Sequence, residues 1–192
     1  MTLAYLISAH TDAPQLKRLV ETLHPDAHFF IHIDKKSDIT PFQALLPQDN
    51  VHFIQERIDV RWGTILEVEY QMALIKAAID HPVTFDRIFF LSGMDYPLWS
   101  NDRITHWLEA QKGKEILSGI CMDNPAISEQ QRTLYSTARP FFRIGFISNQ
   151  ANQRLSIVCR KAKQLLGLRK SLSFPVGNAT WHLYKGAAWW CI

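Results

Sequence analysis

The sequence predicts an α/β fold with a mostly parallel sheet that is covered by helices on both faces. Apolar runs of strand length recur over residues 1–110, and segments with apolar residues at helical spacing separate them. Polar residues that favour turns follow these runs. Strands that alternate with helices are joined by crossovers, and crossovers make neighbouring strands parallel.

The first two predicted strands open the chain. Residues 3–9 form a continuous apolar run that ends at His10, as a strand buried on both faces would. Residues 15–23 then carry leucine and valine at helical spacing. Residues 28–33 form the second strand, which leads directly into the polar turn 34–37. The sequence therefore predicts a β-α-β start.

The next elements follow the same alternation. Residues 51–54 predict a short third strand, and a turn at Trp62-Gly63 precedes a long helix over 65–79. His81-Pro82 ends that helix, because the residue before a proline is restricted to extended conformations.

The pattern continues and then weakens toward the C-terminus. Residues 87–91 predict a fourth buried strand, and the loop 92–97 leads to a helix that Asn101 caps and that runs to Leu108. Beyond Glu115 we expect a strand at 116–120 and a basic helix at 152–166.

Three polar clusters fall at the carboxyl ends of predicted strands. They are His10, the turn 34–36 and the loop 92–95. Ligands of open α/β sheets bind beyond these strand ends, so the three clusters are expected to line one crevice.

Composition bounds the class of protein. A chain of 192 residues that is 47% hydrophobic can bury one sizeable core. Three widely spaced cysteines fit neither a disulfide framework nor a zinc site and indicate a reducing compartment. Residues 3–9 are too short to span a bilayer and lack the flanks of a signal peptide, so we expect a cytoplasmic protein.

The net charge of +3 is mild but unevenly distributed. Residues 132–170 contain nine Lys and Arg and no Asp or Glu. This segment is either a solvated face or a surface for a phosphate-bearing ligand, an acidic membrane or nucleic acid. Nucleic acid ranks last, because no recognition motif for it is present.

Two polar turns offer groups that suit a nucleotide. Asp34 can accept hydrogen bonds from ribose hydroxyls or a base N–H, and Lys35 and Lys36 can pair with a diphosphate. The alternative is an ordinary solvated turn. Asp12 has the same ambiguity, because it can also cap the helix that follows it.

Two further motifs each allow a functional and a structural interpretation. In Arg61-Trp62-Gly63 the indole can stack on a ring or base, or it can pack in the core. In the loop 92–97, Asp95 can face a ligand, or it can bond the backbone N–H groups of its own loop. Glu67 and Glu69 are two residues apart on a predicted helix and do not form a carboxylate pair.

Missing motifs exclude several classes of enzyme. The chain has no Gly-x-Gly-x-x-Gly, no Walker loop and no Gly-x-Ser-x-Gly, which excludes dinucleotide-binding, P-loop and α/β-hydrolase proteins. It also has no Asp-x-Asp pair to hold a diphosphate through a divalent metal. We therefore expect no metal cofactor, with Lys and Arg neutralising the diphosphate.

Taken in order, the motifs resemble a known family. They are Ile31-His-Ile-Asp-Lys-Lys-Ser37, Arg61-Trp-Gly63, Leu91-Ser-Gly-Met-Asp-Tyr-Pro-Leu98 with Asn101, and Gly186-Ala-Ala-Trp-Trp190. This series is similar to that of the core-2/I-branching β-1,6-N-acetylglucosaminyltransferases and the peptide O-xylosyltransferases, and it spans nearly the whole chain.

The resemblance implies a GT-A fold and an inverting, metal-independent transferase. Such an enzyme moves a sugar, GlcNAc or xylose, from a UDP donor to a hydroxyl of a glycan or protein acceptor. By position the uridine and ribose pocket would be lined by Ser8, Asp34, Val60, Arg61 and Trp62. Ala188 and Trp189 would lie near the donor sugar and the acceptor, while His10, Lys35, Ser92 and Asp95 complete the predicted nucleotide-sugar site.

The sequence departs from the family pattern in two places. Ala187 and Ala188 stand where the family carries polar residues before a tryptophan. The general base and a basic pair of the family lie beyond that motif, which leaves Asp95 as the candidate base. We therefore expect a single domain over 1–192 that is incomplete at its C-terminus and inactive alone. Residues 1–110 would form the nucleotide-binding half, and 111–192 the start of the acceptor half.

Two other functions remain open at this point. One is a module that binds a UDP-sugar or glycan without turnover, and the other is a basic domain that docks on acidic lipid. A bacterial protein would be cytoplasmic, either free or at the inner face of the membrane, whereas a eukaryotic one would belong to the Golgi membrane.

Overall fold

The computed structural model of the chain contains two compact units. The first comprises residues 1–117 and 188–192, and the second residues 118–187. The structure describes residues 1–61, 64–117, 119–122, 124–131, 148–168, 171, 173–182, 184–186 and 190–191.

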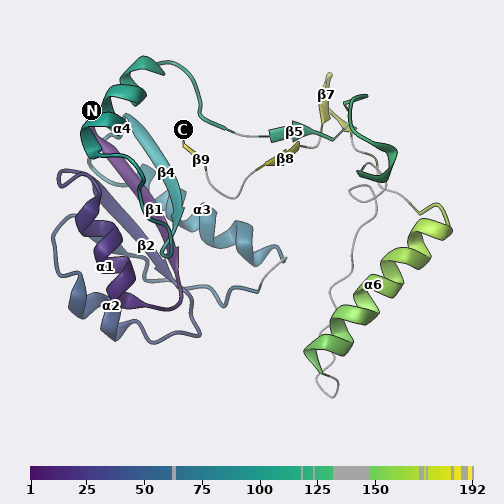
Figure 1. The fold of residues 1–192 in the computed structure, drawn as a ribbon, viewed down its shortest axis with the longest axis horizontal. Helices are drawn as coiled ribbons and strands as arrows, with labels where there is room; N and C mark the ends of the chain where they lie inside the picture. Colours follow the sequence, from purple (N-terminus) through teal and green to yellow (C-terminus); the bar gives the residue numbers. More distant parts are fainter. Residues whose placement is uncertain are drawn as a thin grey trace. The chain divides into compact units, whose positions relative to one another are not determined.

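A five-stranded sheet forms the centre of the first unit (Figure 1). Its strands lie in the order β3-β2-β1-β4-β9, and the first four are parallel, whereas β9 runs antiparallel to β4. The strands are β1 (Leu3–Ala9), β2 (His28–Ile33), β3 (Val51–Phe53), β4 (Arg87–Ser92) and β9 (Trp190–Cys191). This confirms the predicted α/β class with a mostly parallel sheet.

Helices pack against both faces of this sheet. They are α1 (Ala13–Thr22), α2 (Thr40–Leu45), α3 (Leu66–Ile79) and α4 (Asn101–Ala110). Tyr5 and Ile7 of β1 belong to the same core cluster as apolar residues of α1, α2 and α4. Leu6, between them in the strand, packs in a second cluster with Leu74 of α3. Successive side chains of a strand point to opposite faces, so a continuous apolar run is what two covered faces require.

The N-caps of two helices decide two points that the sequence raised. Asp12 has φ 54°, and its carboxylate accepts a hydrogen bond from Gln15 N–H at 3.0 Å, so this residue caps α1. The cap of α4 is Ser100, whose hydroxyl accepts from Arg103 N–H, and the prediction that Asn101 caps this helix is wrong. Serine and asparagine are both strong caps, and sequence spacing alone does not choose between neighbours.

Asn101 instead joins two helices. Its side-chain amide donates a hydrogen bond to the Thr22 carbonyl at 3.1 Å, which ties the start of α4 to the end of α1. The first turn of α4 is thereby fixed against the helix that follows β1.

The second unit contains the helix α6 (Asn149–Leu165) and two small sheets. The strand β5 (Gly119–Cys121) pairs antiparallel with β8 (Tyr184–Gly186), and β6 (Ser173–Val176) with β7 (Ala179–His182). The predicted strand at 116–120 begins only at Gly119. Ile116 and Cys191, which both belong to the first unit, form a bridge through backbone hydrogen bonds of 3.0 and 3.3 Å.

The basic segment 132–170 is described in part, at 148–168. There α6 carries Arg154, Arg160, Lys161 and Lys163, which confirms a basic helix close to the predicted range.

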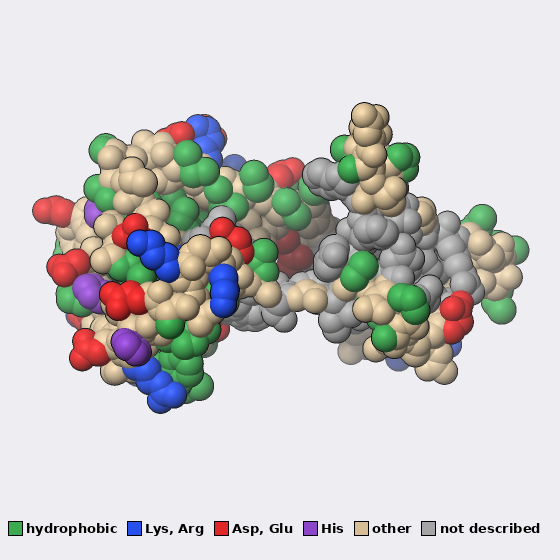
Figure 2. Space-filling view, turned by 90° about the horizontal axis from the view of Figure 1, so that it is seen from above, with side chains coloured by type: hydrophobic (Ala, Val, Ile, Leu, Met, Phe, Trp, Pro, Cys, Tyr) green, Lys and Arg blue, Asp and Glu red, His purple; other side chains and the backbone are tan. Residues whose placement is uncertain are grey.

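On the face of the first unit seen in Figure 2, acidic and basic side chains are interspersed. None of the described helices is long and apolar enough to cross a membrane.

Candidate functional site

A cleft of about 460 Å³ lies at the carboxyl ends of the parallel strands. Five of the predicted site residues line it, namely Ser8, His10, Asp34, Val60 and Ser92. The strand register explains their convergence, because Ser8 of β1 is paired with Ser92 of β4 and Ala9 with Ile33 of β2. The predicted crevice is therefore present, and the strand ends build it.

Asp34 is held rigidly where β2 ends. Its backbone N–H donates to the Ala9 carbonyl at 2.9 Å, and the residue is only 9% exposed. One carboxylate oxygen accepts from the backbone N–H of Lys36 at 3.0 Å, and the other lies 2.9 Å from the Lys36 ammonium. A carboxylate fixed in this way is a preorganised acceptor at the edge of the cleft.

Lys36 links two segments of the chain. Its ammonium also lies 2.8 Å from a carboxylate oxygen of Asp59 and donates to the Val60 carbonyl. Hydrogen bonds to Asp59 and then to Asp34 raise the pKa of Lys36, and the bond from Lys36 lowers the pKa of Asp59. The segment at 59–60 is thereby held against the end of β2, and Val60 is brought to the cleft.

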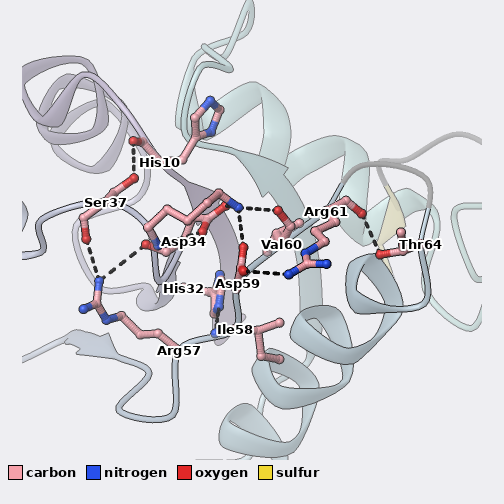
Figure 3. Close-up of polar contacts among 11 residues, drawn as sticks. His10, His32, Asp34, Ser37, Arg57, Ile58, Asp59, Val60, Arg61 and Thr64 are labelled. Carbon is pink, nitrogen blue, oxygen red and sulfur yellow. Dashed lines mark hydrogen bonds and ion pairs between the residues drawn. The ribbon is translucent and has the colours of Figure 1, made fainter. Parts of the chain in front are cut away.

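The turn after β2 receives a second set of bonds. The Arg57 guanidinium donates to the Ser37 carbonyl at 2.8 Å and more weakly to the Asp34 carbonyl at 3.4 Å. The Ser37 hydroxyl donates to the His10 carbonyl at 2.6 Å (Figure 3). The turn 34–37 is therefore bound both to the end of β1 and to the segment around Arg57.

A fully buried histidine supports the floor of the site. His32 Nε2 accepts from Ile58 N–H at 2.9 Å, and its ring stacks on Tyr70 with 5.2 Å between ring centroids. Burial lowers the pKa of His32, so the ring is neutral at neutral pH, as an Nε2 acceptor must be. The Nδ1 atom has no hydrogen-bond partner among the residues that the structure describes.

The loop after β4 is built on a glycine and an internal carboxylate. A Cβ at Gly93 would lie 2.6 Å from the Ala9 Cβ, so β1 admits only glycine there without a shift. Asp95 Oδ2 accepts from Ser92 N–H at 2.7 Å. Asp95 therefore bonds the backbone of its own loop, which was one of the two interpretations of this residue. Asp95 lines an apolar hollow of about 390 Å³ beside α1 and α4, whereas Ser92 faces the cleft. A role of Asp95 as general base stays a prediction.

The remaining predicted residues either do not line the cleft or lie outside the described part of the chain. Lys35 is exposed and joins the site through its backbone N–H, which donates to the Ile58 carbonyl at 3.0 Å. Arg61 is exposed, and a nitrogen of its guanidinium lies 3.4 Å from a carboxylate oxygen of Asp59. Trp62, Ala188 and Trp189 fall outside the described residues.

Five residues line the cleft without having been predicted as site residues, namely Lys36, Glu67, Tyr70, Phe90 and Leu91. Lys36 was identified with Lys35 as a partner for a diphosphate, but the turn geometry selects which of the two faces the cleft. Glu67 and Tyr70 are three residues apart in α3, a spacing that places both on one helix face. That spacing is the signal by which they could have been found. Burial raises the pKa of Tyr70.

Comparison with known proteins gives one family. The family model described as "Branch: Core-2/I-Branching enzyme" matches residues 3–192. Xylosyltransferase 2 of Rattus norvegicus and that of Homo sapiens are each 30% identical over 135 residues, which is 67% of this chain and 16% of the relative. A human N-acetyllactosaminide beta-1,6-N-acetylglucosaminyl-transferase is 24% identical over 139 residues, 69% of this chain and 34% of the relative.

The matched stretch therefore represents only a small part of each xylosyltransferase and about a third of the other relative. The family match itself extends over nearly all of the chain, including both compact units, and it agrees with the resemblance that the ordered motifs predict. The chain belongs to the Core-2/I-branching enzyme family.

Proposed function

We propose that this chain binds a UDP-sugar and belongs to a glycosyltransferase that moves GlcNAc or xylose to a hydroxyl of a glycan or protein acceptor. The observation that supports this most directly is the fixed Asp34 carboxylate at the edge of the 460 Å³ cleft. The volume of the cleft is in the range of small-molecule sites, and cavities of that range take ligands of nucleotide size.

In this proposal the cleft holds the uridine. Asp34 accepts hydrogen bonds from ribose hydroxyls or from the uracil N–H, and the Ser8 and Ser92 hydroxyls add polar contacts. Tyr70 and Phe90 supply aromatic surface for the base. The family resemblance implies that Trp62 would also line the uridine and ribose pocket.

We further propose that transfer is inverting and needs no metal ion. The cations at or beside the cleft are Lys36, Arg57 and Arg61, and the carboxylates there are Asp34, Asp59 and Glu67. Lys36, which lines the cleft, and Arg61, which is exposed beside it, would offset the developing charge of the diphosphate leaving group. The attacking hydroxyl needs a base within hydrogen-bond reach, for which Asp95 is the candidate that the motifs supply.

Calorimetric titration of the chain with UDP in EDTA tests the proposal. We expect binding without metal and unchanged affinity when Mg²⁺ is added. Asp34→Asn should weaken UDP binding by about 10- to 100-fold, because hydrogen bonds to a charged group contribute about 1.5–3 kcal/mol. Asp26→Asn, an exposed aspartate before the start of β2, is the matched control and should bind UDP as the unmodified chain does.

Three outcomes would count against the proposal. Binding that requires Mg²⁺ would contradict the metal-independent site, and equal losses in both variants would remove Asp34 from it. A chain that binds acidic vesicles but no UDP would favour the lipid-docking alternative. Release of UDP from a UDP-sugar only when an acceptor is present distinguishes a transferase from a binding module without turnover.

A further inference from the structure

Three histidines from separate elements meet at the amino ends of the strands. His28 begins β2, His52 lies in β3, and His81 lies between α3 and β4. One ring nitrogen from each lies within 4.8 Å of the other two. The cluster and Asp34 are at opposite ends of β2, a six-residue strand that spans roughly 20 Å.

His28 and His52 already direct ring nitrogens at each other. His28 Nδ1 lies 3.1 Å from His52 Nε2, and the two ring planes differ by only 8° with centroids 5.4 Å apart. This spacing fits two rings edge to edge, joined by a hydrogen bond. The His81 ring is equidistant from both, with its centroid 4.8 Å from each of theirs.

The protonation state of the pair suits a metal ligand. Burial, together with the charge of neighbouring histidines, lowers the pKa of His28 and of His52. Both rings are then neutral at neutral pH, and neutral imidazole is the form that binds metal. Three neutral imidazoles are a ligand set that Zn²⁺ accepts, with water in the fourth position.

We propose that His28, His52 and His81 bind a Zn²⁺ ion at the amino edge of the sheet. With Zn–N bonds of about 2.0–2.1 Å, the nitrogens of a tetrahedral site are about 3.3 Å apart. The separation of His28 and His52 is close to that value, and no separation in the cluster exceeds it by more than about 1.5 Å. The His81 ring therefore has to move closer, and the His28 and His52 rings, whose nitrogens face each other, have to tilt so that both point at the ion.

The hydrogen bonds of the cluster show what has to change. The proton shared by His28 and His52 moves to the outer nitrogen of its own ring, so that both facing nitrogens carry a free electron pair. His81 Nδ1 accepts from Val83 N–H at 3.2 Å. Zinc binding breaks this bond whichever nitrogen is used, because Nδ1 either becomes the ligand or takes the proton that leaves Nε2.

The surroundings give the ion a route and a structural role. A groove of about 500 Å³ is lined by His52 and His81, so solvent reaches two of the three ligands. Phe30 packs against the rings of His52 and His81, and Phe85 packs against those of His28 and His81. The bound ion would join β3, which pairs with β2 at only three positions, to the connection between α3 and β4.

The test uses the chain without a polyhistidine tag, stripped of metal by a chelator. Calorimetry should show one Zn²⁺ per chain, and Co²⁺ should give the strong visible absorption of a tetrahedral site. With free Zn²⁺ at 100 times its Kd, Tm should rise by about 5–10 °C. Absence of a saturable Co²⁺ spectrum would overturn the proposal.

Variants assign the ligands. His52→Gln and His81→Gln should each lower Zn²⁺ affinity at least 100-fold and abolish the Tm shift. His106→Gln, which changes an exposed histidine of α4, should retain both. Equal Zn²⁺ affinity in all three variants would show adventitious binding and overturn the proposal.

A measurement on the unmodified chain does not depend on the folding of any variant. Nitrogen NMR of the imidazoles should show ring nitrogens of His28, His52 and His81 shifting on addition of Zn²⁺ while those of His106 stay in place. Shifts at other histidines alone would refute the site. UDP binding, measured in EDTA, is independent of this result.

Discussion

At the scale of single residues, the site depends on a few side chains whose neighbours leave them little freedom. Gly93 is required because the Ala9 Cβ occupies the space that a larger residue would need. His32 is required to accept a backbone N–H while remaining neutral in the core. Both contacts lie next to the cleft, so a change in either residue should affect stability and ligand binding together.

Gly93→Ala should destabilise the protein by about 1–3 kcal/mol, because an added methyl group 2.6 Å from another must displace β1 or the loop. Urea unfolding measures the loss. Ala9→Gly in the same chain removes the opposing Cβ, and the double variant should recover most of the loss that the Gly93 change adds. No recovery would show that the contact with Ala9 is not the cause.

His32 should make stability depend on pH. Burial lowers its pKa in the folded chain below the ordinary value of 6.5, so between the two pKa values the unfolded chain binds more protons. This contribution is complete above about pH 6.5 and is lost as pH falls toward the folded pKa. The free energy of unfolding, measured from pH 5 to 7.5, should therefore rise with pH.

His32→Gln keeps an acceptor for Ile58 N–H but does not titrate. The variant should be less stable than the unmodified chain at pH 7.5, with a flatter pH profile. His106→Gln, at an exposed position, should keep the original slope. An unchanged slope in His32→Gln would assign the dependence to other groups.

At the scale of elements, helix starts and strand ends carry the geometry of the site. Asp12 and Ser100 cap the helices that follow β1 and β4, the two strands whose ends bear Ser8 and Ser92. Asn101 then joins α4 to α1. The orientation of the strand ends is thus linked to the packing of two capped helices.

Ser100→Ala should cost about 1 kcal/mol, because it leaves an N–H of the first turn of α4 without its side-chain acceptor. Chemical denaturation checks this. Ser100→Asp retains an acceptor and should stay within a few tenths of a kcal/mol of the unmodified chain. A similar loss in both variants would place the effect in side-chain packing instead.

At the scale of the whole molecule, the parallel sheet is the most cohesive part of the described chain. β1 pairs with β2 on one side and β4 on the other over six positions each, whereas β3 pairs with β2 at three. Both faces of β1 are covered by core clusters. The cleft is therefore built on strands with many hydrogen bonds and little access to water.

Amide hydrogen exchange should follow this arrangement. The amides of β1 should exchange slowest, with free energies of opening close to that of global unfolding, and those of the edge strand β3 should exchange faster. Saturating Zn²⁺ should slow β3 in particular if the three-histidine site forms. Equal protection of β1 and β3 without metal would contradict the proposed order.

By itself the sequence determined the α/β class, the four parallel strands and the polar clusters at their ends, because these follow from local periodicity and from the crossover rule. The ordered motifs also identified the family. Five of the predicted residues meet in the cleft, since the carboxyl ends of parallel strands share one edge.

Tertiary structure decided what each polar side chain contacts. It brought Lys36 rather than Lys35 to the cleft, turned Asp95 toward the N–H of Ser92, and placed Asp59 against Lys36. It also assembled His28, His52 and His81, which 53 positions separate from first to last. Some of these contacts join residues that are far apart in the sequence, and one depends on a choice between two adjacent lysines. No local sequence pattern encodes such contacts, because the packing of strands and turns decides them.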